Sequence, residues 1–345
     1  MEMSYLSKVY FFLLMPKIFL MTAVSFCVAL LFTPIITHFL YKYNIRQQIR
    51  EEAVDGKKSS VFYSLHERKK NTPTMGGIII WVSVLLVTVL FNLSRSQTWL
   101  PLFVLVSAGI LGVFDDLFNV LSIGAQKGIR ALRKLALQIL IASIGAWWFF
   151  YKLGFHSIHI PGVGDFNIGW LYIILFIFVM VASMNSVNIT DGLDGLAAGL
   201  LAIAFGAFAI IAFAKGKLEL AAFCGSILGA LLAFLWFNVY PARFFMGDTG
   251  SMALGATLGV VALLLNSVLV LPIIGFVFVI ETLSSIIQLF SKKFFKKKIF
   301  ISAPLHHHLE AKGWPEPKIT MRLWIISAVM GSIGLVVGLI GMGVR

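Results

Sequence analysis

Long apolar segments recur along the 345-residue chain and alternate with short polar segments. A helix crosses a hydrocarbon layer of about 30 Å with roughly 20 apolar residues. Ten windows approach or exceed that length: 18–40, 76–93, 99–114, 135–153, 168–187, 196–214, 218–237, 251–265, 268–290 and 323–342. The pattern predicts an all-α polytopic membrane protein with ten transmembrane helices, folded as a single integral membrane domain over residues 1–345.

Composition narrows the class of protein further. Hydrophobic residues make up 59% of the chain and charged residues 12%, which excludes an ordinary soluble domain. The formal net charge is +13, but no compact basic domain remains outside the windows to bind nucleic acid. We therefore expect membrane lipid with an anionic surface as a partner, and no nucleic acid.

The basic residues are divided unequally between the two sets of connections. Alternate connections carry 21 of the 28 Lys and Arg residues, and they are 41–75, 115–134, 188–195, 238–250 and 291–322. Because Lys and Arg concentrate on the cytoplasmic side of a membrane, this set is predicted to be cytoplasmic, with both termini outside. The outside segment 156–169 has alternating stretches around a turn, which predicts a small β-hairpin.

Carboxylates and carboxamides gather at the predicted cytoplasmic ends of the windows. Asp115 and Asp116 end the third window, and Asp248 precedes the eighth. The intervening sequence adds Asn185, Asn188, Asp191 and Asp194 at steps of three, and Asn238 at the end of the seventh window. The carboxylates repel one another unless a cation lies among them. Mg²⁺ prefers oxygen ligands and substrate phosphates, so the pattern predicts a magnesium site for diphosphate chemistry.

Basic and imidazole side chains flank these acids. The candidates to balance phosphate charge are Lys69, Lys70, Lys127, Arg130 and Arg133. His306, His307 and His308 are consecutive, so on a helix two of them can face a pocket while the third points elsewhere. Glu281, in the middle of the ninth window, is either a buried hydrogen-bonded acid or a residue that lines a groove.

Each of these signals has an ordinary structural interpretation when it is taken alone. Two adjacent acids can be a solvated helix end, DGLDG can be a turn, and a triple His can belong to a loop. The carboxylates nonetheless fall on one predicted face, at window ends that were inferred independently. The joint pattern therefore favours a functional site.

Four motifs in this order carry a resemblance to a known family. GVFDDLFN, NITDGLDGLAAG, FMGDTGS and APLHHHLE resemble the polyprenyl-phosphate N-acetylhexosamine-1-phosphate transferases. The continuous triple His, and NTPTMGG after a basic stretch, resemble the phospho-N-acetylmuramoyl-pentapeptide transferase (MraY) branch of that superfamily. The similarity covers nearly the whole chain.

The resemblance implies a reaction and a location. UDP-N-acetylmuramoyl-pentapeptide and undecaprenyl phosphate would give lipid I and UMP in the first membrane step of peptidoglycan synthesis. It also implies a requirement for Mg²⁺, an active site facing the cytoplasm at the bacterial cytoplasmic (inner) membrane, and a homodimer.

The resemblance further implies roles for individual residues. Asp115, Asp116 and Asp248 would be the catalytic acids and metal ligands, with Asp248 the favoured ligand. The substrate-binding residues would be Lys70, Asn188, Asp191, Asp194, Asn238, Phe245, His306, His307 and His308. Among these, Phe245 would contact the uracil.

Three alternatives stay open from the sequence. The acceptor phosphate attacks directly, or an Asp carboxylate attacks first and forms a covalent intermediate. A sister enzyme would transfer N-acetylglucosamine-1-phosphate from UDP-N-acetylglucosamine instead. A secondary transporter would also contain intramembrane acids, but its site would lie near the midplane on broken helices rather than at window ends.

Overall fold

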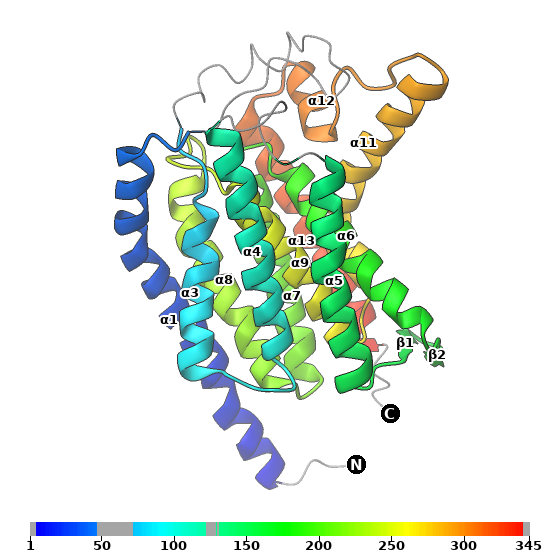
Figure 1. The fold of residues 1–345 in the computed structure, drawn as a ribbon. Helices are drawn as coiled ribbons and strands as arrows, with labels where there is room; N and C mark the ends of the chain where they lie inside the picture. The colour runs from blue at the N-terminus through cyan, green and yellow to red at the C-terminus, as the bar shows by residue number, and fades with distance from the viewer. Residues whose placement is uncertain (1–4, 47–71, 122–128, 130, 341–345) are drawn as a thin grey trace.

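The computed structural model describes residues 5–46, 72–121, 129 and 131–340, which form a bundle of long helices (Figure 1). The helices are α1 (Tyr5–Lys42), α3 (Gly77–Phe91), α4 (Trp99–Val120), α5 (Ala131–Trp147), α6 (Leu171–Thr190), α7 (Leu196–Ala214), α8 (Leu218–Asn238), α9 (Gly247–Leu264), α10 (Leu271–Ile274), α11 (Phe276–Phe294), α12 (Leu305–Ala311) and α13 (Glu316–Ile340). A π-helical turn, η2 (Trp148–Lys152), continues α5.

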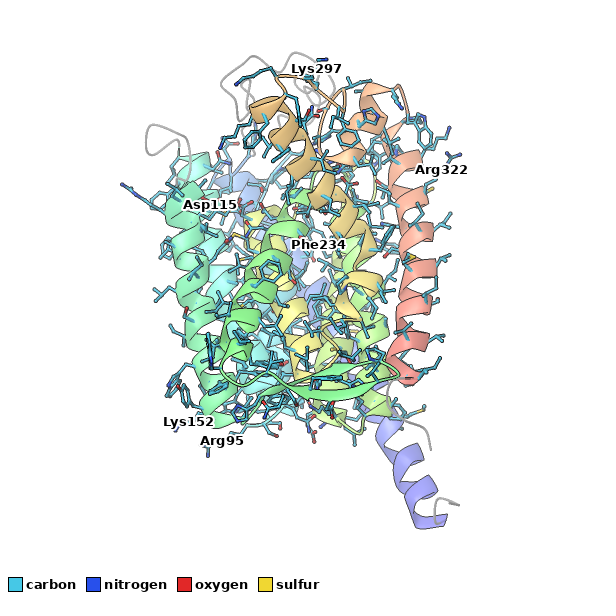
Figure 2. The ribbon with its side chains drawn as sticks, turned by 90° about the vertical axis from the view of Figure 1, so that its right-hand side faces the viewer. Arg95, Asp115, Lys152, Phe234, Lys297 and Arg322 are labelled. Carbon is cyan, nitrogen blue, oxygen red and sulfur yellow. The ribbon has the colours of Figure 1, made fainter. Side chains whose placement is uncertain are left out.

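The two ends of the bundle differ in what they carry. The short helix α12 lies at one end, which we call the α12 end, and the start of α1 and the end of α13 lie at the other (Figure 1). Asp115 and Lys297 are near the α12 end, whereas Arg95 and Lys152 are near the opposite end (Figure 2). Charged groups that are distant in sequence are thus sorted onto the two ends.

The predicted hairpin is present at the end opposite α12. Strands β1 (Ser157–Ile160) and β2 (Gly164–Asn167) pair antiparallel, with Ser157 opposite Asn167 and Ile160 opposite Gly164. Backbone hydrogen bonds from Ile168 and Gly169 to the carbonyl of His156 close its base. The prediction of a small β-hairpin within 156–169 is confirmed.

Each predicted window falls on a helix, and eight described helices are long and apolar enough to cross a membrane. The other two windows fall on α3, which has 15 residues, and on α11. Helix α11 is less apolar because it contains Glu281, Lys292 and Lys293. Its polar side chains Ser284 and Gln288 are buried against the bundle, while Ile286 and Phe290 are exposed. The number of ten membrane spans stays a prediction.

Three helix boundaries differ from the predicted windows. Gly275 separates α10 from α11, so the ninth window is broken. Helix α9 begins at Gly247, which puts Asp248 in its first turn rather than in a connection before it. Helix α5 begins at Ala131, so Lys134 lies on a helix. A window of apolar residues cannot detect a polar first turn, which explains the last two differences.

Helix α9 lies at the centre of the packing, and every residue from Thr249 to Leu264 is buried. Glycines let its neighbours approach closely. A Cβ atom on Gly112 of α4 would lie 2.3 Å from the carbonyl oxygen of Asp248. A Cβ atom on Gly255 of α9 would lie 2.7 Å from the carbonyl oxygen of Ser183 on α6. The first contact fixes the start of α9 against α4, and the second fixes the middle of α9 against α6.

Two lysines cap the other end of α9. Lys215 donates hydrogen bonds to the carbonyl of Leu265 and to Ser267 Oγ, and Lys217 donates to the carbonyl of Leu264. Cations at a helix C-terminus stabilise the helix dipole. Burial, together with the charge of Lys217, lowers the pKa of Lys215 to about 8. The helix that carries Asp248 is therefore held at its far end by two half-buried lysines.

Helix α1 packs against α8 through two glycines with the spacing of a GxxxG motif. A Cβ atom on Gly229 would lie 2.0 Å from the carbonyl oxygen of Thr22, and one on Gly225 would lie 2.7 Å from Thr22 Oγ1. Small residues at such spacing let two membrane helices touch along their backbones.

We expect Gly229→Ala to destabilise the protein by about 1–3 kcal/mol, because the new methyl group meets backbone atoms that cannot turn aside. Gly206→Ala on α7 is the matched control, since its Cβ would meet only Leu228 Cδ2, at 4.0 Å. Thermal unfolding of the two purified variants in detergent measures the difference. Equal melting temperatures would contradict the close packing of α1 on α8.

Candidate active site

The three predicted catalytic acids converge although they come from distant parts of the chain. Asp115 and Asp116 lie in the last turns of α4, and Asp248 lies in the first turn of α9. The close approach of Gly112 to the carbonyl of Asp248 brings the two helix ends together. The cluster lies toward the α12 end, as the position of Asp115 shows (Figure 2).

Asp116 caps the start of α9. Its side chain is buried, its Oδ1 accepts a hydrogen bond from the backbone N–H of Asp248 at 3.3 Å, and its Oδ2 accepts one from Thr249 at 3.0 Å. A carboxylate at a helix N-terminus satisfies free N–H groups and favours the helix dipole. Gly247 has a φ of +72°, and a Cβ there would lie 2.6 Å from Asp116 Oδ2. Asp116 therefore orients the turn that carries Asp248.

Asp115 and Asp248 share one cation, the ammonium group of Lys134 on α5. Lys134 Nζ donates to Asp115 Oδ2 at 2.9 Å and also to Asp248 Oδ2. Asp115 Oδ1 accepts a further hydrogen bond from the backbone N–H of Ile129 at 2.9 Å, and Asp248 Oδ1 accepts one from Asn188 Nδ2 at 2.7 Å. Lys134 is a site residue that the sequence pattern alone does not indicate. The nearest indication in the sequence is that Lys134 directly follows Arg133, in the same basic stretch.

The oxygen donors of this cluster fit a divalent cation. Within the described residues, no three His, Cys, Asp or Glu side chains are arranged to hold a metal ion, and Lys134 lies between the carboxylates of Asp115 and Asp248. One ammonium group balances only one of these carboxylates. Both are hard oxygen donors of the kind that Mg²⁺ prefers. That Asp116 also ligates metal stays a prediction, since its observed contacts are with the backbone of α9.

The three consecutive histidines on α12 each use Nδ1 for a different partner. His306 Nδ1 lies 3.0 Å from Glu281 Oε2, and His307 Nδ1 lies 2.7 Å from Glu310 Oε2. His308 Nδ1 accepts a hydrogen bond from the backbone N–H of Ile301 at 3.2 Å. The second ring nitrogens of His306 and His307 both lie near Gly192, whereas Nδ1 of each of the three rings is used for a separate contact.

Glu281 is a buried hydrogen-bonded acid, which resolves the two interpretations left open by the sequence. It is 0% exposed, and its Oε2 accepts from the backbone N–H of His306 at 3.2 Å in addition to contacting the ring. Glu281 Oε1 and His306 Nε2 have no hydrogen-bond partner within the described residues. Glu281 of α11 thus fixes the orientation of His306.

Gly192 brings the DGLDG segment against these histidines. A Cβ atom on Gly192 would lie 2.3 Å from His306 Nε2 and 3.2 Å from His307 Nε2. Asp191, the residue before it, ends α6 three positions after Asn188. The imidazoles and the carboxylate cluster are therefore linked through the last turn of α6.

Two of the predicted substrate-binding residues make mainly backbone contacts. Asp194 Oδ2 accepts from the N–H of Ala242 at 2.9 Å. Asn238 Oδ1 accepts from the N–H of Gly195 at 3.1 Å, and its Nδ2 donates to the carbonyl of Phe244 at 2.9 Å. Both side chains are buried, and both join the segment after α6 to the connection between α8 and α9.

The remaining predicted site residues are Phe245 and Lys70. The backbone N–H of Phe245 donates to the carbonyl of Pro73 at 2.8 Å, and its carbonyl accepts from the N–H of Gly76 at 2.8 Å. The segment just before α3 is therefore attached to the connection that leads to Asp248. Lys70, like Lys69, Lys127 and Arg130, lies outside the described residues.

Comparison with known proteins identifies the family of this helical bundle. A family described as Glycosyl transferase family 4 matches residues 98–266, which include the carboxylate cluster. A motif described as Phospho-N-acetylmuramoyl-pentapeptide-transferase signature 1 matches residues 69–80.

Curated relatives match almost the whole chain. The phospho-N-acetylmuramoyl-pentapeptide-transferase of Geobacillus thermodenitrificans is 43% identical over 320 residues, which cover 91% of this chain and 95% of the relative. The enzyme of the same name from Oceanobacillus iheyensis is 43% identical over 90% of this chain and 95% of its own. That from Bacillus anthracis is 42% identical over 91% and 96%. The chain belongs to the phospho-N-acetylmuramoyl-pentapeptide-transferase family.

We expect Gly192→Ala to abolish most of the activity and to lower stability by about 1–3 kcal/mol, because the methyl group collides with an imidazole that Glu281 holds in place. Gly206→Ala, in open space, is the control. Turnover and melting temperature of the purified variants check this. Full activity in Gly192→Ala would mean that the contact between Gly192 and His306 is not needed.

Proposed function

We propose that the protein transfers phospho-N-acetylmuramoyl-pentapeptide from UDP-N-acetylmuramoyl-pentapeptide to undecaprenyl phosphate, giving lipid I and UMP. Family membership at 43% identity supports this reaction. The main structural support for this chemistry is that Asp115, Asp248 and Lys134 converge from three helices. This cluster combines carboxylate oxygens with a cation, as the cleavage and formation of a diphosphate requires.

The proposed topology follows from the distribution of charge. The connections predicted to be cytoplasmic carry 21 of the 28 Lys and Arg residues. We propose that the α12 end faces the cytoplasm, with ten helices spanning the cytoplasmic membrane as one domain. The start of α1 and the end of α13 both lie at the opposite end, which supports external termini (Figure 1). The active site then faces the compartment in which sugar nucleotides are made. The proposed homodimer rests on the family resemblance alone.

We propose that Mg²⁺ is the cofactor and that Asp248 and Asp115 hold it. When bound, this ion supplies charge neutralisation for the diphosphate and for the departing UMP. The Lys134 ammonium, which contacts both carboxylates, is close enough to neutralise phosphate charge as well. Asp116, through its contacts with the N–H groups of Asp248 and Thr249, positions Asp248 rather than touching the reacting atoms.

The proposed chemistry is direct attack by the lipid phosphate. An oxygen of undecaprenyl phosphate bonds to the phosphorus attached to the sugar, and the bond from that phosphorus to the bridging oxygen breaks, releasing UMP. The acceptor is largely ionised near pH 7, so Asp115 needs at most to take its last proton. Exchange of labelled UMP into the sugar nucleotide by lipid-free enzyme would instead indicate a covalent Asp intermediate.

We propose that the nucleotide binds between the carboxylate cluster and the histidines. Asn188 is bonded to Asp248, and Gly192 contacts His306 and His307, so the last turn of α6 joins both parts. Phe245 lies three residues before Asp248 and would contact the uracil. The backbone contacts of Asp194 and Asn238 support a role in shaping the pocket. Lys70, which precedes the described segment, would contribute a cation.

Incubation with UDP-N-acetylmuramoyl-pentapeptide, undecaprenyl phosphate and Mg²⁺ tests the proposed function. The expected products are lipid I and UMP, and a chelator should stop their formation. UDP-N-acetylglucosamine in a parallel reaction is expected to give no lipid product. A lipid product from UDP-N-acetylglucosamine alone would identify the sister enzyme, and solute uptake into vesicles without any lipid product would identify a transporter.

We expect Asp115→Asn, Asp116→Asn and Asp248→Asn each to lower turnover by at least about 10²-fold, because each removes a charge from the cluster. Lys297→Ala is the control: its side chain is exposed, and the hydrogen bond from Ser291 goes to its backbone carbonyl. Turnover is measured on purified variants whose melting temperatures match that of the wild type. Near-normal turnover in Asp248→Asn would remove that residue from the mechanism.

A further inference from the structure

A cavity separate from the carboxylate cluster lies between α1 and the end of α8. Its volume is about 440 Å³, within the range of roughly 300–1,000 Å³ typical of ligand sites. The lining residues are Thr33, Pro34, Thr37, Tyr41, Phe237, Arg243 and Phe244. None of the proposed catalytic or substrate-binding residues is among them. The cavity is therefore lined by other residues than those proposed for the reaction.

The walls of the cavity are largely apolar despite the threonines. Thr33 Oγ1 donates to the carbonyl of Ala29 at 2.8 Å, and Thr37 Oγ1 donates to the carbonyl of Thr33 at 2.7 Å. Their hydroxyls are thus occupied within α1. Phe237 and Phe244 pack on each other with ring centroids 5.9 Å apart and form the opposite wall. Such walls suit an acyl chain better than a sugar or a nucleotide.

Arg243 gives this apolar cavity one positive group. Its side chain is exposed, and its guanidinium carbon lies 5.7 Å from the centre of the Phe237 ring. Its backbone is fixed on both sides: the N–H donates to the carbonyl of Phe237 at 2.9 Å, and the carbonyl accepts from the Tyr41 hydroxyl at 2.9 Å. None of the described residues that line the cavity is an acid. A guanidinium in this setting matches a phosphate, which it can bind through two hydrogen bonds.

Aromatic side chains mark the depth of the cavity in the membrane. Trp236 and Tyr240 at the end of α8 are 76% and 51% exposed, and Tyr41 and Tyr43 at the end of α1 are 51% and 63% exposed. Exposed Trp and Tyr gather at the level of the lipid headgroups. The cavity therefore opens where a phosphate and the start of an acyl chain are both available.

We propose that this cavity binds an anionic phospholipid of the surrounding bilayer, with its phosphate on Arg243 and its upper acyl chain against Phe237 and α1. The proposal uses the membrane placement given above and is independent of the transferred sugar. The lipid-linked substrate is not the occupant, because its phosphate must reach Asp115 and Asp248, and neither borders the cavity.

Occupancy would stabilise the connection that carries the active site. Arg243 lies five residues before Asp248, and the intervening Phe245 and Met246 are hydrogen-bonded to the segment 73–77. A phosphate on Arg243 would restrain the start of this connection from the lipid side. Bound phospholipid would thus order the segment leading to α9.

Native mass spectrometry of the full chain in detergent tests the proposal, with phosphatidylglycerol or phosphatidylcholine added at equal concentration. The wild type is expected to retain one phosphatidylglycerol in preference to phosphatidylcholine. Arg243→Gln should weaken that retention by about tenfold or more, the usual effect of losing a hydrogen bond between charged groups. Arg322→Gln is the matched control, because this exposed Arg also lies over an aromatic ring, Trp314, outside the cavity.

A second variant keeps the result interpretable if Arg243→Gln folds poorly. Thr37→Trp fills the cavity without changing charge and should also displace phosphatidylglycerol. Unchanged retention in both variants, equal loss in Arg322→Gln, or equal retention of phosphatidylcholine would overturn the proposal. Displacement of phosphatidylglycerol by undecaprenyl phosphate at a much lower concentration would assign the cavity to the substrate instead. Lipid I formation is assayed in parallel, so that a failure of the phospholipid proposal can be distinguished from a failure of the proposed function.

Discussion

The structure depends on neutralising three carboxylates that α4 and α9 bring together in an apolar bundle. Charges of one sign in such a setting are costly unless each finds a partner. Asp116 is stabilised by the N-terminal amides of α9, whereas Asp115 and Asp248 share Lys134. The two solutions differ in consequence. The helix amides satisfy the carboxylate of Asp116. In contrast, Asp115 and Asp248 have one ammonium group between two carboxylates, and this arrangement can accept a further cation and phosphate.

Close backbone packing makes this convergence possible. Gly112 lets α4 reach the first turn of α9, and Gly247 leaves room for the carboxylate of Asp116. Gly192 leaves room for the imidazole of His306, whose orientation is set by Glu281. A methyl group at Gly112 would collide with the backbone of Asp248, and one at Gly247 or Gly192 would collide with the side chain of Asp116 or His306. The geometry of the site therefore depends on glycines at these three positions as much as on the acids.

The sequence predicts local features well and long-range partners poorly. The apolar windows, the hairpin and the acids at window ends all follow from patterns within a few residues. Lys134 could not be chosen over Arg133, because only the rotation of α5 against α4 decides which of them reaches Asp115. The partners of His306 and Asp116 lie 25 and more than 130 positions away. The break at Gly275 could not be predicted from the sequence either, because the residues on both sides are apolar.

The central claim is that Asp115 and Asp248 together form a divalent cation site in which Lys134 takes part. Anomalous diffraction from crystals soaked in Mn²⁺, a close substitute for Mg²⁺, tests it most directly. The account predicts a single strong peak within bonding distance of both carboxylates, with the ammonium of Lys134 moved away from at least one of them. A peak elsewhere, or an undisturbed Lys134 bridge at saturating Mn²⁺, would contradict it.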